Sequence, residues 1–339
     1  MGCKPVIERK LSFRISIQFV LFCLMMLVTL PVTKTFGAGK KIDTSSCPAL
    51  ADLATDSFII EKAEIVPEGP APGPRGNSDL LPEHCLFQGT LNPRTGAKGQ
   101  KFGIGFELRM PTNWNNRFFF QGGGGLDGVL SPATGNFMGA IKPSALARGF
   151  AVVSTDGGHR SSMLDGTFGL DQQARIDYGY NALDKVTLKA KELIEKYYGA
   201  APSYSYFIGC SNGGRQALMA SQRLPLYFDG IVAGDPAIKF SGIAMDEIWN
   251  LQVAARIAPK DENGRPIISK AFSNEDLNLV ADTLLKRCDA LDGLADGFIN
   301  DWRGCDFDPG ILTCKSGKTE ACLPPLEHPI KYEKDGAAP

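Results

Sequence analysis

The sequence predicts an α/β fold, in which a mostly parallel β-sheet is covered by helices. Two observations carry this expectation. Short runs of apolar or β-branched residues recur along the middle of the chain, and segments with helical periodicity alternate with them. Strands that alternate with helices usually form a parallel sheet with helices on both faces. We therefore expect that architecture here.

Each expected element has its own signal. Runs that are apolar at alternate positions, or short and rich in apolar or β-branched residues, are expected to be strands: 101–111, 117–121, 150–156, 204–208 and 230–234. Between residues 182 and 198, apolar residues recur at helical spacing with charged residues opposite, which predicts an amphipathic helix. A second helix is favoured after Gly214.

The N-terminus has the order of a secretory signal peptide. A basic region precedes an apolar run at 15–32, and small residues follow at Gly37 and Ala38, where cleavage is expected. The alternative is an uncleaved membrane anchor, because the apolar run is nearly long enough to span a bilayer. We favour cleavage, which predicts a secreted or periplasmic protein without stable membrane insertion. The formal net charge of -1 gives no reason to expect nucleic acid as a partner.

Nine cysteines occur in the chain, and removal of Cys3 and Cys23 with the signal leaves an odd number, seven. Cysteines of an exported protein are first interpreted as disulfides. One cysteine therefore lacks a partner within this chain. Cys210 is the candidate for the unpaired cysteine, because it lies directly before Ser211, the serine of the motif described next.

That serine lies in the segment GCSNG at 209–213, which fits the pattern G-x-S-x-G. The pattern alone is often only a glycine-rich turn. Here a strand precedes it and a helix follows, which is the context of a nucleophile elbow. We therefore predict that Ser211 is a catalytic nucleophile, presented over a helix N-terminus whose partial positive charge favours an oxyanion. The flanking glycines are expected because larger side chains would collide in so tight a turn.

A serine nucleophile also needs hydrogen-bond donors for the tetrahedral intermediate. One is expected to be the backbone N–H of Asn212, and the other should come from a loop after an earlier strand. The glycines at 122–125 follow such a strand, and we favour Gly122, with its neighbours nearly equivalent. The alternatives are a flexible turn or a phosphate-binding loop, but the Lys-Ser/Thr ending of the latter motif is absent.

Several longer segments resemble one protein family. The stretches 206–237, 149–159, 117–128 and 288–309 resemble the tannase and feruloyl esterase family, which also contains hydrolases of mono(2-hydroxyethyl) terephthalate. The resemblance implies an α/β-hydrolase core with an inserted lid domain. It also implies a serine carboxylic ester hydrolase that acts through an acyl-enzyme on small-molecule esters of aromatic acids, of the feruloyl, galloyl or terephthaloyl type.

The resemblance implies a disulfide pattern as well. In this family the cysteine before the nucleophile pairs with a cysteine adjacent to the catalytic histidine, so Cys210 awaits a downstream partner. The other implied pairs are Cys47 with Cys85, Cys288 with Cys305, and Cys314 with Cys322. Each of these closes a short sequence interval, which limits the loop-closure entropy.

The chain departs from the family in its histidines. Only His328 follows Ser211, and no cysteine adjoins it; His84 precedes Cys85 but lies upstream, in the wrong order. His159 is expected to be structural. The family places its catalytic acid and histidine after the lid, beyond Pro339. We therefore expect a fragment that carries the nucleophile half of the active site. The alternative is a catalytically inactive, calcium-binding remnant.

A calcium site is expected from a second cluster. Three carboxylates in a glycine-punctuated loop, Asp289, Asp292 and Asp296, converge only if a hard cation offsets their repulsion. The resemblance adds the backbone carbonyls of Leu294 and Phe298 to this Ca²⁺ site. The alternative is a solvated acidic turn.

These expectations define three segments: a signal peptide at 1–38, the N-terminal part of the hydrolase core at 39–239, and an incomplete lid at 240–339. The resemblance places the last core strands after the lid, so the sheet is expected to end in an exposed edge.

Overall fold

A computed structural model describes residues 44–72, 79–136, 142–315 and 322–323. The chain divides into two compact units, Met1–Pro236 and Ala237–Pro339, close to the expected boundary after residue 239. The expected signal peptide lies outside the described residues. Among the helices of the described ranges, none is long and apolar enough to cross a membrane.

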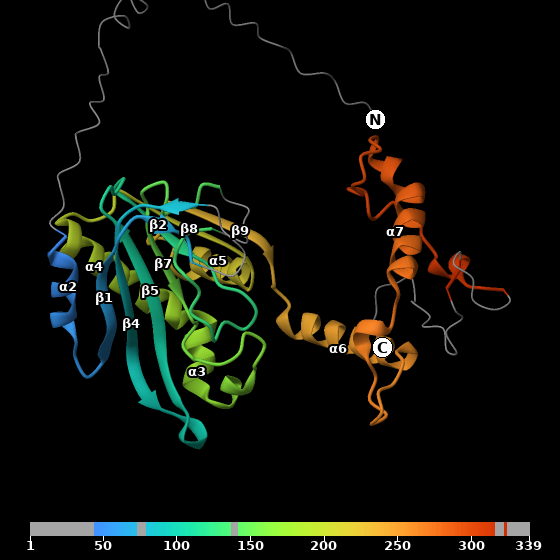
Figure 1. Ribbon diagram of the computed structural model, residues 1–339, viewed down its shortest axis with the longest axis horizontal. Helices are drawn as coiled ribbons and strands as arrows, with labels where there is room; N and C mark the ends of the chain where they lie inside the picture. Colours follow the sequence, from blue (N-terminus) through green and yellow to red (C-terminus); the bar gives the residue numbers. More distant parts are fainter. Residues whose placement is uncertain (1–43, 73–78, 137–141, 316–321, 324–339) are drawn as a thin grey trace, which may run out of the picture. The chain divides into compact units, whose positions relative to one another are not determined.

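The first unit is built on a seven-stranded sheet in the order β1-β4-β5-β7-β6-β8-β9 (Figure 1). The strands of this unit are β1 Phe58–Val66, β2 Gly69–Pro70, β3 Leu80–Leu81, β4 His84–Thr95, β5 Lys101–Pro111, β6 Arg117–Gln121, β7 Ala151–Thr155, β8 Tyr204–Ser211 and β9 Gly230–Pro236. Its helices are α2 Ser46–Ala49, η1 Leu50–Leu53, η2 Ala97–Gly99, η3 Thr167–Leu170, α3 Gln172–Ile176, η4 Asp177–Asn181, α4 Ala182–Tyr198 and α5 Asn212–Arg223. The α/β class is confirmed.

The sheet is mixed rather than mostly parallel. Strands β7, β6, β8 and β9 pair in parallel. Strand β4 pairs antiparallel with β1 on one side and with β5 on the other, and β5 joins β7 antiparallel. The antiparallel half arises because β4 and β5 are joined by a short turn around η2, which leaves no room for a helical crossover.

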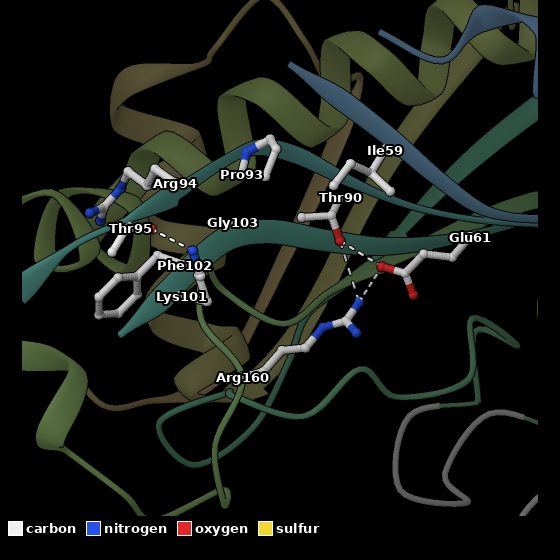
Figure 2. A pocket seen from close by; sticks show the side chains of 10 residues that line it. All are labelled: Ile59, Glu61, Thr90, Pro93, Arg94, Thr95, Lys101, Phe102, Gly103 and Arg160. Carbon is white, nitrogen blue, oxygen red and sulfur yellow. Dashed lines mark hydrogen bonds and ion pairs between the residues drawn. The ribbon is translucent and has the colours of Figure 1, made fainter. Parts of the chain in front are cut away.

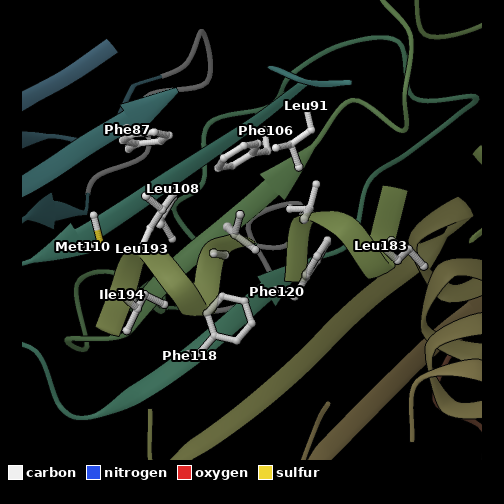
Figure 3. Close-up of a cluster of buried hydrophobic side chains, with 14 of the residues drawn as sticks. Phe87, Leu91, Phe106, Leu108, Met110, Phe118, Phe120, Leu183, Leu193 and Ile194 are labelled. Atoms are coloured by element: carbon white, nitrogen blue, oxygen red, sulfur yellow. The ribbon is translucent and has the colours of Figure 1, made fainter. Parts of the chain in front are cut away.

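The larger hydrophobic core lies between one face of the sheet and the helices α2, α4 and α5. Phe118 and Phe120 of β6 point to this face, and Leu193 and Ile194 of α4 pack on it (Figure 3). Phe119 points to the other face, where a second cluster includes Ala133 and Leu146 from the irregular connection between β6 and β7. The alternation in β6 thus sends apolar side chains to both faces, as in a buried strand. In the described part of the chain the second cluster is covered by this connection and by Ala71 and Leu81 of the β2–β3 segment, rather than by the expected helix layer.

The second unit contains α6 Phe240–Ile257, η5 Ile268–Lys270, α7 Asn274–Cys288, η6 Asp289–Asp292 and η7 Pro309–Leu312. A capping box between Ser273 and Asp276 starts α7. Disulfides join Cys288 to Cys305 and Cys314 to Cys322, so the loops that follow α7 are cross-linked at both ends.

Candidate active site

Ser211 stands at the junction of β8 and α5, where the chain turns from strand to helix. Its backbone has φ 55° and ψ −121°, a conformation that residues with a side chain rarely adopt. The residue is exposed, while Asn212, Gly213 and Gly214 behind it are buried. This strained turn presents the Ser211 hydroxyl at the C-terminal edge of the parallel strands and at the N-terminus of α5.

Glycines make the turn possible because backbone packs directly on backbone. A Cβ atom on Gly209 would overlap the carbonyl oxygen of Gly213, and one on Gly214 would overlap that of Gly234. A Cβ atom on Gly122 would lie 2.8 Å from the Cα of Gly209 and 2.9 Å from that of Gly213. The glycine loop after β6 is therefore in direct contact with the elbow.

The glycine loop corrects one sequence-based expectation. The N–H of Gly122 donates to the carbonyl of Ile208 at 2.9 Å, which continues the pairing of β6 with β8. It is therefore not free to bind an oxyanion. The N–H of Gly123 donates to Oε1 of Gln216 at 2.9 Å. The next amide, that of Gly124, makes no hydrogen bond within the described residues, and a Cβ atom there would have no heavy atom within 4 Å.

The side chain of Asn212 points away from the surface into a buried network. Its Oδ1 accepts from the Tyr178 hydroxyl at 2.9 Å and from Nε of Arg215 at 2.8 Å. Its Nδ2 donates to Oδ1 of Asp127. Burial raises the pKa of Asp127 to about 7, although Arg215 and the hydrogen bonds from Gln216 and Asn212 oppose the rise. Sequence reasoning misses Asp127, because a lone aspartate after four glycines has no motif of its own.

The two histidines within the described ranges do not contact Ser211. His159 is fully buried and stacks on Phe168 with ring centroids 3.8 Å apart. Burial lowers its pKa to about 4, so the ring is neutral near pH 7, which agrees with a structural role. At His84, Nε2 accepts from Arg109 at 2.9 Å and Nδ1 donates to the carbonyl of Pro82 at 2.7 Å. His328 lies outside the described residues.

The cysteines of the described part form three disulfides and leave one thiol. Cys47–Cys85, Cys288–Cys305 and Cys314–Cys322 are bonded, the pairs that the family resemblance implies. Cys210, directly before Ser211, is a free, partly buried thiol. Its expected downstream partner is not among the described residues and stays a prediction.

In the acidic loop of the second unit, aspartate carboxylates accept hydrogen bonds from backbone N–H groups of the same loop. The Asp289 carboxylate accepts from the N–H groups of Asp296, Gly297 and Phe298. Asp292 accepts from Leu294, and this backbone hydrogen bond lowers the pKa of Asp292. Carboxylates with nearby carbonyls are suitable ligands for a hard cation. Within the described ranges, however, no three acidic, histidine or cysteine side chains are gathered as a metal site, so Ca²⁺ stays a prediction.

A surface pocket of about 570 Å³ lies on β1, β4 and β5 and contains none of the elbow residues (Figure 2). Its charged groups already have partners, and Lys101 donates to the hydroxyl of Thr95 at 2.7 Å. Arg160 points to Glu61, with Nη2 2.6 Å from Oε1, and Arg94 pairs with Asp171 at 2.7 Å. Ser211 therefore remains the candidate for chemistry.

The comparisons with known proteins agree with this geometry. The family described as tannase and feruloyl esterase matches residues 90–327. A mono(2-hydroxyethyl) terephthalate hydrolase of Piscinibacter sakaiensis is 42% identical over 84% of this chain and 51% of its own length. A probable feruloyl esterase B-2 of Aspergillus flavus is 32% identical over 65% of this chain and 39% of its own length.

Among solved structures, feruloyl esterase B of Aspergillus oryzae superposes with a TM-score of 0.64 at 26% identity. The match covers 83% of this chain and 53% of that protein, so the chain spans about half the length of such relatives. The family match covers most of the chain, and the strand–serine–helix junction lies inside it. On this evidence the chain belongs to the tannase and feruloyl esterase family.

Proposed function

We propose that this chain carries the nucleophile of a serine carboxylic ester hydrolase whose substrates are small-molecule esters of aromatic acids. The observation that carries the proposal is the strained backbone of Ser211 at the junction of β8 and α5. Such a serine, exposed at a helix N-terminus between closely packed glycines, has the local geometry of a nucleophile elbow. The substrate class is inferred from the names of the relatives, a mono(2-hydroxyethyl) terephthalate hydrolase and probable feruloyl esterases.

In the proposed reaction, Ser211 Oγ attacks the ester carbonyl carbon while its proton passes to a general base. The tetrahedral intermediate collapses, the bond to the alcohol oxygen breaks, and the alcohol leaves with that proton. Water then attacks the acyl-enzyme, releases the aromatic acid and restores the serine. Neither His84 nor His159 hydrogen-bonds to Ser211, so the base in this proposal is a histidine outside the described residues.

The oxyanion is proposed to bind two backbone N–H groups. One belongs to Asn212, the first residue of α5, where the helix dipole adds to the stabilisation. The other is assigned to Gly124, because the amides of Gly122 and Gly123 already have partners.

Export and calcium binding complete the proposal. The three disulfides support folding in an oxidising compartment, secreted or periplasmic. The loop Asp289–Asp296, with the carbonyls of Leu294 and Phe298, is proposed to hold one structural Ca²⁺. The ion would stabilise the second unit, and no step of the reaction uses it.

The test compares Ser211→Ala with Ser221→Ala, a matched change on an exposed position of α5. In the full-length protein, Ser211→Ala should lower turnover of an aromatic methyl ester by about 10⁴-fold or more, as expected for loss of a nucleophile. Ser221→Ala should retain wild-type turnover. Turnover in Ser211→Ala close to wild type would overturn the proposal. A folded, calcium-binding wild type without turnover would favour the inactive remnant instead.

A further inference from the structure

The buried carboxylate of Asp127 accepts hydrogen bonds from two side chains of α5. Oδ1 accepts from Nδ2 of Asn212, and Oδ2 accepts from Nε2 of Gln216 at 2.6 Å. The exposed fractions of Asp127, Asn212 and Gln216 are 3%, 1% and 1%. Since water is excluded, each of these polar groups depends on the others for its hydrogen bonds.

The orientations of both amides are fixed by further contacts. Asn212 Oδ1 already accepts from Tyr178 and Arg215, so its Nδ2 has to face Asp127. Gln216 Oε1 already accepts from the N–H of Gly123, so its Nε2 also faces Asp127. The group at position 127 must therefore accept at both ends, which an ionised carboxylate does and an amide cannot.

Glycines leave the space that this carboxylate occupies. A Cβ atom on Gly123 would lie 2.6 Å from Asp127 Oδ1, and one on Gly157 would lie 2.7 Å from Oδ2. Asp127 itself has φ 54°, and its N–H donates to the carbonyl of Gly124 at 2.9 Å. Asp127 is thus attached directly to the glycine loop as well as to α5.

These contacts connect the two sides of the proposed oxyanion hole. Asn212 carries one N–H donor, and Gln216 lies one turn further along α5 and holds Gly123, the neighbour of the second donor Gly124. We propose that Asp127 is a positioning residue that fixes the distance between the N–H groups of Asn212 and Gly124. This inference rests on the proposed serine mechanism. Asp127 contacts no reacting atom in it and acts through Asn212, Gln216 and the glycine loop.

Asp127→Asn tests this role with a change of almost no volume. The new amide can accept from only one of its two partners and must place its own N–H₂ against the other. If the donors then shift, kcat should fall between about 10- and 100-fold, because a misplacement of about 1 Å can cost 10²-fold. KM should change less than about twofold, because the oxyanion forms only after binding. Rates should be divided by the concentration of active sites, measured by titration with an aryl phosphonate. A lower yield of folded protein then does not lower the measured kcat.

The double variant Asp127→Asn with Asn212→Asp restores the pattern of donors and acceptors. The carboxylate introduced at position 212 would accept from Tyr178, Arg215 and the new amide at position 127, and that amide would accept from Gln216. We expect kcat to return to within about threefold of wild type, as a restored network of coupled partners allows.

Asp156→Asn is the matched control for the single variant. Asp156 is equally buried, but it hydrogen-bonds to Gly105 and Gly158 rather than to α5. The control should therefore leave kcat unchanged.

The outcomes are separable. Folded Asp127→Asn with wild-type kcat, or a folded double variant no faster than the single one, would overturn the positioning role. If the single variant does not fold, a folded double variant with a tenfold or greater loss of kcat would overturn it, and one with wild-type kcat would support it. Turnover that persists in Ser211→Ala would instead overturn the serine mechanism, and with it the role of Asp127.

Discussion

Gly122 and Gly209 pack backbone to backbone, so closely that a Cβ atom on Gly122 would lie 2.8 Å from the Cα of Gly209. Gly122 follows β6 directly, and Gly209 lies within β8, two residues before Ser211. This contact fixes the glycine loop against the elbow. The place of the glycine loop beside the elbow is therefore set by the packing of β6 on β8.

Gly209→Ala should destabilise the first unit, because the new methyl group would overlap the Gly213 carbonyl and backbone cannot move aside cheaply. We expect a loss of about 1–3 kcal/mol in the free energy of unfolding, the usual cost of overpacking. Gly179→Ala is the control, since a Cβ atom there has no heavy atom within 4 Å. Urea unfolding followed by fluorescence measures both, and equal stability of the two variants would contradict the packing argument.

The stability of the fold should depend on pH through Asp156. Its Oδ2 makes no hydrogen bond in the described part of the chain. Burial raises the pKa of Asp156 to about 7; the charge of Asp127 raises it further, whereas Arg160 lowers it. The unfolded pKa is about 3.9. Between these two pKa values the folded state binds one proton more than the unfolded state. The contribution of Asp156 to the free energy of unfolding is therefore complete below about pH 4 and is lost as the pH rises through about 7.

The measurement is the melting temperature of the wild type relative to Asp156→Asn at pH 5 and pH 8. Asp127 titrates in the same range and raises the pKa of Asp156, so the comparison measures the effect of removing Asp156 from this coupled pair. The wild type should lose stability relative to the variant between pH 5 and pH 8. A relative stability that is the same at both pH values would show that Asp156 is not protonated in the folded state near neutral pH.

The alternation of strands and helices is enough to predict the central elements. The expected helix at 182–198 and the expected strands at 101–111 and 117–121 are confirmed. The helix has a regular period that no Gly or Pro interrupts, the strand at 101–111 alternates, and 117–121 is a short apolar run. Strands β1 and β4 are not predicted. β4 contains Gly89, Asn92 and Pro93, residues that usually indicate turns, and its pairing depends on partners far along the chain.

The site is only partly predictable for a related reason. The motif G-x-S-x-G identifies the turn, but it does not say which glycine amide is already used by the sheet, and so the preference for Gly122 over its neighbours is wrong. Asp127 escapes prediction because its importance comes from contacts with Asn212 and Gln216, which lie 85 and 89 positions away. Such long-range contacts leave no local sequence pattern.

Cys210 should be a free thiol in this chain. A maleimide label applied to the exported, unreduced chain under denaturing conditions should modify Cys210, since the remaining six cysteines are paired. Those six should react only after reduction. Peptide mapping by mass spectrometry that finds Cys210 bonded to any of the six would contradict the disulfide pattern.

Removal of calcium should destabilise the second unit. If the loop Asp289–Asp296 binds Ca²⁺, a concentration of about 100 times the dissociation constant adds about 2.7 kcal/mol to stability, provided that the ion binds only the folded state. A chelator should therefore lower the melting temperature of the wild type, and Asp292→Asn with Asp296→Asn should abolish the chelator's effect. Asp301→Asn, an exposed acid of the same unit, should keep it. Equal wild-type melting temperatures with and without chelator would show that the loop Asp289–Asp296 is only an acidic surface turn.

Direct capture of the acyl-enzyme tests the central claim, that Ser211 is the nucleophile. The full-length protein is mixed with an activated aromatic ester, quenched in acid within the first turnover, digested and mapped by mass spectrometry. Our account predicts one added acyl group per chain, on the peptide that contains Ser211, and none in Ser211→Ala. Hydrolysis of the ester with the acyl group found on another residue, or with equal labelling of Ser211→Ala, would contradict it.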